Sequence, residues 1–429
     1  MTTPRRLERD LPALLADLYL AGTPDYRDDL VRTIARTPQR AAWTFPERWL
    51  PMDIATERVP TARFPMRALG ILALIGILIA ASVAIYVGAQ PRLPEPFGPA
   101  ATGLHVYTRH GDVITRDGID GPERILFPGE AAVLRFAPSP DGTQLLSVQV
   151  IDGGVGLFVS SIDGSDRIMV AGPLGDLGRI EWSPDGSTIA VAHGEPDASA
   201  ILLVAADGSG TRPLDVGMPA DEPTWRPPDG RMLAFRGKAD MSWSLFITDA
   251  DGSTAPRLLD VERALLNAPY EVLGPVWSPS GDRIAYHRLV MTPGQGSDGA
   301  GFRIAVASVD AGGALLGDLT LELDAESDDE YFPHWMPDGS AIVYLVREAD
   351  RDSLAMAAPE AGATVTRFGV TSAGTDARNL WPSVTPDGRE IIVHDYATSS
   401  DYLIDVATSD VTPLDGNTDD GFAFQRRAE

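Results

Sequence analysis

Short apolar runs alternate with turn residues along most of the chain, and one type of turn occurs six times. Five copies read Pro-Asp-Gly and one reads Pro-Ser-Gly. Proline presets one backbone dihedral, aspartate caps its own backbone and glycine accepts a positive φ, so each copy predicts a β-hairpin turn. Hairpins that recur every 44 to 58 residues predict a repeat array. The turns begin at Pro140, Pro184, Pro228, Pro279, Pro337 and Pro386.

The residues around the second turn form a complete unit of four predicted strands. We expect these strands at 179–182, 188–192, 200–205 and 211–214. Four antiparallel strands per unit are typical of a propeller blade. Another turn, Asp-Gly-Ser, recurs at 163–165, 207–209 and 251–253. We interpret its aspartates as caps of their own turns, with calcium binding as the alternative.

A tryptophan stands two residues before the turn proline in the clearest copies, at Trp182, Trp277 and Trp335. This fixed spacing predicts a structural role in the core. The Trp-Ser-Pro-Asp-Gly stretch of 182–186 and the Asp-Gly turns resemble the WD40-like (PD40) repeats of TolB-type propellers. The resemblance covers about three quarters of the chain. It implies an all-β propeller of the kind used as a binding platform in unrelated systems.

The two ends of the repeat region indicate how the ring closes. Residues 105–108, 112–115 and 124–127 are typical of second, third and fourth strands without a first. Residues 421–424 are typical of a first strand with nothing after it. Joined, they form a blade that removes two sheet edges. We therefore predict seven blades over 103–429, with six as the alternative.

Residues 68–89 form a stretch of 22 residues without a charge, long enough to cross a bilayer as one helix. Arg58, Arg63 and Arg67 precede it closely, whereas only Arg92 follows. The positive-inside rule therefore predicts a cytoplasmic N-terminus and an extracytoplasmic propeller, in a single-pass protein of the cell membrane. Residues 90–102 are rich in proline and predict a stiff stalk.

Residues 1–67 predict a short α-helical arm. Leu11, Leu14 and Leu18 share one helical face, and Trp43 and Trp49 follow in a stretch interrupted by prolines. Such short helices bury little surface alone. They either fold on each other beneath the tryptophans or dock on a partner, and these five side chains are the candidate partner-binding residues.

A cytoplasmic arm, one membrane crossing and an extracytoplasmic domain together resemble the layout of membrane-bound anti-sigma factors. Residues 11–15, 26–30 and 43–49 look like the arm of bacterial membrane proteins with this layout. The zinc-type domains of anti-sigma factors use a histidine and paired cysteines, which residues 1–67 lack. The resemblance implies a sigma factor as the candidate cytoplasmic partner.

The net charge of −26 is concentrated after residue 89, where the sequence has 24 basic and 52 acidic residues. Such an acidic domain repels phosphates, so we expect no nucleic acid partner. The acidic stretch 324–330 predicts a solvated loop, with a cation site or a site for a basic partner as the alternative. The chain has no cysteine, no Gly-x-Ser-x-Gly elbow, no phosphate loop and no His-Glu-x-x-His motif. We therefore expect no catalytic residue, metal or cofactor.

Three histidines are candidate ligand contacts at one mouth of the channel: His193, His287 and His394. Each falls at the end of a second strand, six or seven residues after the turn glycine. The alternative is that the strand end merely tolerates histidine.

These patterns favour a non-enzymatic binding or scaffold module, anchored in the membrane, for an unknown extracytoplasmic protein, peptide or glycan. The alternative is an anti-sigma-like transmembrane regulator, in which the propeller senses and the arm binds a partner. An enzyme acting at the channel mouth is the third hypothesis.

The predicted topology can be tested with single cysteines, because the chain has none of its own. A membrane-impermeant maleimide added to intact cells should label Asp197→Cys in a repeat loop but not Thr44→Cys in the arm. After lysis, both should label. Labelling of Thr44→Cys from outside intact cells would contradict the orientation.

Overall fold

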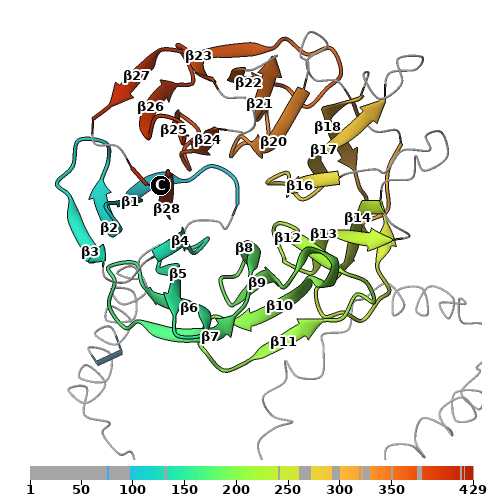
Figure 1. Cartoon of the computed structure of the whole chain (residues 1–429), viewed down its shortest axis with the longest axis horizontal. Helices are drawn as coiled ribbons and strands as arrows, with labels where there is room; N and C mark the ends of the chain where they lie inside the picture. Colours follow the sequence, from blue (N-terminus) through green and yellow to red (C-terminus); the bar gives the residue numbers. More distant parts are fainter. Residues whose placement is uncertain are drawn as a thin grey trace, which may run out of the picture. The chain divides into compact units, whose positions relative to one another are not determined.

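The propeller is described by a computed structural model, which resolves all seven predicted blades (Figure 1). Within the described residues, seven sheets of four antiparallel strands form a ring, with the first strand of each sheet nearest the centre. These sheets lie in the compact unit Pro91–Glu429. The described residues are 75–76, 97–129, 133–239, 242–259, 272–291, 300–317, 320–321, 329–348, 351–373, 379–415, 418–419 and 421–428.

The blades are numbered here in chain order, beginning with the first continuous sheet. Blade 1 contains β4 (Val133–Pro138), β5 (Gln144–Ile151), β6 (Gly154–Ser161) and β7 (Ile168–Leu174). Blade 2 contains β8 (Leu177–Trp182), β9 (Thr188–His193), the 3-10 helix η5 (Pro196–Ala198), β10 (Ala200–Ala205) and β11 (Thr211–Leu214). Blade 3 contains β12 (Ala220–Trp225), β13 (Met232–Ala239), β14 (Ser242–Asp249) and β15 (Arg257–Leu258).

The remaining blades follow the same order of strands. Blade 4 contains β16 (Val272–Trp277), β17 (Arg283–Met291), β18 (Ala300–Ser308) and β19 (Thr320–Leu321). Blade 5 contains β20 (Asp329–Trp335), β21 (Ile342–Glu348), β22 (Arg351–Ala357) and β23 (Thr366–Ala373). Blade 6 contains β24 (Leu380–Val384), β25 (Glu390–Asp395), β26 (Ser400–Asp405) and β27 (Val411–Leu414).

Blade 7 is built from both ends of the described chain, as predicted. Its strands, in sheet order, are β28 (Phe422–Arg427), β1 (Ala101–Arg109), β2 (Asp112–Asp117) and β3 (Arg124–Phe127). The antiparallel register pairs Phe422 with Tyr107 and Phe424 with His105. The C-terminal strand is therefore the inner strand of the blade, and the pairing closes the ring.

The repeated turns have the hydrogen bonds that their residue types predict. In blade 2, the Asp185 carboxylate accepts from the Ser183 hydroxyl at 2.6 Å and from the Ser187 N–H at 3.0 Å. Gly186 has φ +68°, in the left-handed region. In the second turn, the Asp207 carboxylate accepts from the Ser209 N–H at 2.8 Å. The aspartates therefore cap their own turns, as we interpreted them.

The turn tryptophans connect neighbouring blades. Trp182 and Trp277 are 5% and 6% exposed, which confirms their predicted core role, whereas Trp335 is half-buried. Trp225, which was not among the predicted tryptophans, is buried in the same way in blade 3. Each indole N–H donates to a carbonyl oxygen in the first strand of the preceding blade. The bonds are Trp182 to Ala137 (3.1 Å), Trp225 to Glu181 (3.2 Å), Trp277 to Thr224 (3.3 Å) and Trp335 to Val276 (3.1 Å).

The hydrophobic core is divided into clusters that lie between neighbouring blades. Leu157 of blade 1 packs with Val191 of blade 2, for example, and Ile392 of blade 6 packs with Phe422 of blade 7. The second strands are buried most uniformly, because a blade covers each of their faces. Burial between blades thus stabilises the ring as a whole.

Several predicted segments lie outside the described residues or differ from expectation. The helical arm 1–67, and the membrane helix 68–89 apart from residues 75–76, lie outside. Of the acidic stretch, Asp329 and Glu330 belong to β20 rather than to a solvated loop. Their carboxylates accept the backbone N–H groups of Phe302 and Ile304 at 2.6 and 2.7 Å. These two acids therefore hold blade 5 against blade 4.

Two turn glycines allow a matched test of this packing. Gly186→Ala should lower the free energy of unfolding by about 1–2 kcal/mol, because alanine is strained at positive φ. Gly281→Ala should cost about 2 kcal/mol more, because its new Cβ would lie 2.0 Å from the Pro227 carbonyl oxygen, whereas nothing lies within 4 Å at Gly186. Urea unfolding measures both. Equal losses would contradict the packing of this turn against blade 3.

Candidate functional site

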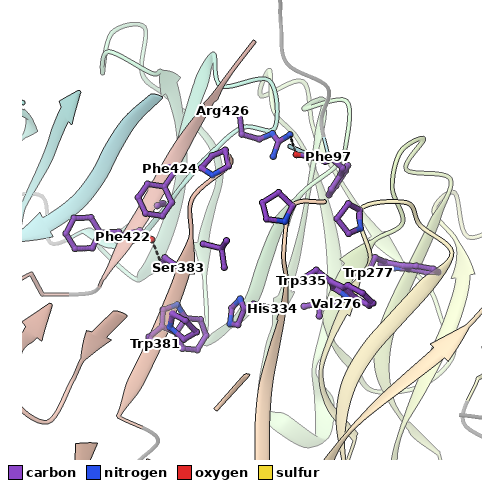
Figure 2. Close-up of a pocket in the computed structure, with 17 residues that line it drawn as sticks. Phe97, Val276, Trp277, His334, Trp335, Trp381, Ser383, Phe422, Phe424 and Arg426 are labelled. Carbon is purple, nitrogen blue, oxygen red and sulfur yellow. Dashed lines mark hydrogen bonds between the residues drawn. The ribbon is translucent and has the colours of Figure 1, made fainter. Parts of the chain in front are cut away.

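A cavity of about 430 Å³ lies on the inner side of four consecutive blades (Figure 2). Its wall comes from the first strands of blades 4 to 7, β16, β20, β24 and β28, and from the turns that follow three of them. Its volume is within the range of small-ligand sites. The side chains used below are Val276, His334, Trp381, Ser383, Phe422 and Phe424.

A local irregularity of the first strands turns particular residues toward this cavity. In blade 5 the register of β20 against β21 shifts between Tyr331 and His334, and Phe332 has φ +49°. Equivalent shifts occur in β12 and β16. A bulge re-aims the side chains that follow it. The residue just before the turn tryptophan thereby lines the cavity, as Val276 and His334 do.

The lower part of the cavity in Figure 2 has an aromatic wall. The Trp381 ring lies 5.7 Å from both the Phe332 ring and the His334 ring, measured between centroids. Trp381 remains 40% exposed, which is unusual for so large an apolar side chain inside a ring of strands. Tryptophan faces of this kind bind apolar, aromatic and sugar surfaces.

His334 is a neutral polar group in this wall. Burial and, to a smaller extent, the nearby positive charge of Arg179 together lower its pKa to about 4. A protonated imidazole is disfavoured in this setting because the surroundings solvate a charge poorly. At neutral pH the ring therefore offers one hydrogen-bond donor and one acceptor.

Charged side chains line the inner strands of blades 2 and 3. Arg179 pairs with Glu181 at 2.9 Å, and its other terminal nitrogen donates to the Pro275 carbonyl oxygen of blade 4 at 2.8 Å. Glu222 accepts from the Gly274 N–H at 2.5 Å, and burial raises the pKa of its carboxyl. The centre of the ring is therefore apolar and aromatic on one side and charged on the other.

The upper end of the cavity in Figure 2 is formed partly by a segment outside the blades. Phe97 and Gly98 line it, and the Gly98 carbonyl oxygen accepts from the Arg426 guanidinium at 2.6 Å. The Ala100 N–H donates to the Pro386 carbonyl oxygen at 2.9 Å. The chain thus enters β1 across the mouth on which the Pro-Asp-Gly turns lie.

The three predicted histidines lie in separate blades, and none lines this cavity. His193 ends β9 and is half-buried. His287 is fully buried among Phe302, Tyr331 and Phe332, with ring centroids 5.4 to 5.6 Å away. Its ring therefore supports Phe332, which in turn contacts Trp381. Direct ligand contact by these histidines stays a prediction.

His394 belongs to a buried polar network in blade 6. Its Nδ1 lies 2.8 Å from the Asp401 carboxylate, which also accepts the Thr418 hydroxyl at 2.9 Å. The Thr418 N–H donates to the other oxygen of Asp401 at 2.9 Å. The network satisfies buried polar atoms and ties the approach to β28 to blade 6.

The other candidates concern the membrane, the arm and metals. Among the residues that the structure describes, no helix is long and apolar enough to span a membrane. The arm residues Leu11, Leu14, Leu18, Trp43 and Trp49 lie outside the described residues. Within the described ranges, no group of three or more histidine and acidic side chains is placed to hold a metal ion.

Sequence reasoning missed His334, Trp381 and Phe97 as cavity residues. The available signal was the position of each residue relative to the repeated turn. His334 stands directly before a turn tryptophan. Trp381 stands three residues before Val384, which takes the place of that tryptophan in blade 6, so Trp381 is equivalent to Phe332 in blade 5. That His334 faces inward follows from the bulge in β20, whereas β24 pairs without a register shift and Trp381 reaches the cavity through the packing of the blades. Phe97 stood in the predicted stalk, which by itself pointed to no binding role.

Comparison with known proteins agrees with this architecture. The model of the TolB beta propeller domain (PD40) matches residues 112–356. TolB from Acinetobacter baumannii is 16% identical, with a TM-score of 0.45 over 66% of each chain. The tricorn protease is 12% identical, with a TM-score of 0.53 over 78% of this chain and 36% of that one. A Desulfotomaculum acetoxidans protein is 11% identical, with a TM-score of 0.51 over 76% and 99%.

The fold and its central cavity define the class of protein as a seven-bladed β-propeller. Because the family model covers more than half of the sequence, the chain belongs to the PD40 family of TolB-type β-propeller domains. The search of curated proteins found no match. At these identities the tricorn protease and the Desulfotomaculum acetoxidans protein show the shared fold alone.

The lowered pKa of His334 predicts a pH-dependent stability. Between pH 6.5 and about 4 the unfolded histidine binds a proton that the folded one does not, so stability should fall as the pH is lowered through this window. In the variant His334→Gln, the free energy of unfolding should fall less over this pH window, by a difference on the order of 2 kcal/mol. Thermal unfolding from pH 7 to 4 measures it. Identical pH profiles for both proteins would contradict the assignment.

Proposed function

We propose that the protein is a non-enzymatic binding module that holds a segment of a protein, peptide or glycan in the channel of its propeller. The observation that carries this proposal is the aromatic wall of the cavity, where Trp381 is 40% exposed beside the neutral His334. A concave, mostly apolar site with few polar groups is the usual form of a binding pocket.

The lining of the cavity supports binding rather than catalysis. Its polar side chains are His334, Ser383 and Arg426, and two of these have structural partners. The Ser383 hydroxyl donates to the Phe422 carbonyl oxygen at 2.7 Å, and Arg426 holds Gly98. The tricorn protease is an enzyme by its name, but its likeness to this chain concerns the fold.

Membrane anchoring is part of the proposal. Residues 68–89 are uncharged over a bilayer-spanning length and are preceded by three closely spaced arginines. In that arrangement the propeller faces outward, and the apolar face of the arm at Leu11, Leu14 and Leu18 faces the cytoplasm. A sigma factor is the candidate partner there, on the layout described above.

Trp381→Ala should weaken ligand binding at least about tenfold, because buried aromatic contacts contribute about 2 kcal/mol or more at such sites. Purified full-length protein is screened on peptide and glycan arrays, and the affinity of each ligand found is then measured by titration. Ile125→Ala is the matched control, since Ile125 is 55% exposed on the outer strand β3. Ligands that bind wild type and Trp381→Ala equally would place binding outside the cavity.

A further inference from the structure

We propose that the end of the cavity lined by the turn prolines is a binding site for an extended aromatic–glycine peptide, and that Phe97 and Gly98 of this chain occupy it in cis. This inference rests on the proposed function, because it assigns a ligand class and a form of regulation to the same cavity. Three features of the segment carry it: its position, its backbone contacts and its independence from the blades.

The position of Phe97 is that of a ligand side chain. The residue precedes β1 and belongs to no blade, yet it lines the cavity (Figure 2). The turn prolines Pro279, Pro337 and Pro386 line the same region. Aromatic and proline rings pack well together, so this end of the cavity suits an inserted aromatic side chain.

The backbone contacts of the segment are also those of a bound peptide. Arg426 donates to the Gly98 carbonyl oxygen at 2.6 Å, and the Ala100 N–H donates to the Pro386 carbonyl oxygen at 2.9 Å. Gly98 has φ +85°, a conformation that favours glycine over other residues. Pro99 is exposed and is not among the residues that line the cavity. The contacts therefore select an aromatic residue and a glycine in sequence.

The tether explains how so small a segment can fill the site. Burying one phenylalanine side chain contributes only about 1.5–3 kcal/mol. A segment attached directly to β1, however, faces its site at an effective concentration in the millimolar range. A weak ligand therefore occupies the site when it is covalently linked, and a competing segment has to displace it.

If a partner segment displaced the segment at Phe97, binding of the partner in the cavity would release the part of the predicted stalk that precedes β1. A partner that inserts its own aromatic–glycine segment would release Phe97 and Gly98 from the end of the cavity lined by the turn prolines. The aromatic wall at Trp381 lies toward the other end of the cavity in Figure 2 and does not require that release. The two ends of the cavity can thus be tested independently.

The test uses the full-length protein and a synthetic peptide of residues 91–100, PRLPEPFGPA. In the variant Phe97→Ala/Gly98→Val the cis segment loses its ring, and a β-branched residue disfavours the positive φ of Gly98. Pro99→Ala is the matched control within the segment. Binding is followed by the fluorescence of the tryptophans that line the cavity, Trp277, Trp335 and Trp381, and thermal unfolding confirms that each variant is folded.

The peptide should bind Phe97→Ala/Gly98→Val saturably and at least about tenfold more tightly than it binds wild type or Pro99→Ala. A peptide with alanine in place of its phenylalanine should not bind. Absence of saturable binding to the folded double variant, or equal binding to wild type, would overturn the inference. Either result leaves the proposed function to be decided by its own test, because array ligands that depend on Trp381 report on the other end of the cavity.

Discussion

The pairing of β28 with β1 is the interaction on which the rest of the propeller depends. It joins the two ends of the ring, so that no blade presents an open edge there. It also places Phe422, Phe424 and Arg426 on the inner side of blade 7, where they complete the cavity wall. The same pairing holds β1 in place, and with it the segment at Phe97. The closure of the ring, the completion of the cavity wall and the position of Phe97 therefore all depend on this one strand pairing.

The repeated tryptophans belong to the structural frame of the propeller, whereas residues next to them in sequence line the cavity. Each indole bonds to the preceding blade through its N–H, which constrains the residue type at that position. The residue just before it lines the cavity in blades 4 and 5, where it is Val276 and His334. In blade 3 it is Thr224, which is buried and donates to the Glu181 carboxylate at 3.0 Å. A constant frame with variable inward positions allows the blades of one ring to present different side chains to the cavity.

Much of the fold could be predicted from local sequence, because its signals are local. The turn residues, the strand ranges of blade 2 and the closure by 421–424 all follow from short-range chemistry and are confirmed. The site was harder to predict. The position of His287 within its strand was visible in the sequence, but its enclosure by Phe302, Tyr331 and Phe332 depends on blades 4 and 5 packing together. A side chain's neighbours in the adjacent blade are not encoded at any fixed spacing.

The sequence by itself determined the repeat, the turn chemistry and the acidity, because each depends on residue type and spacing. It favoured seven blades with six as the alternative, and the structure shows seven. Only the tertiary structure decided which side chains meet at the centre. The bulged first strands turn His334 inward, and the ring brings Trp381, Phe422 and Phe97 from distant parts of the chain to one cavity. That convergence depends on blade-to-blade packing, a long-range property that no single repeat contains.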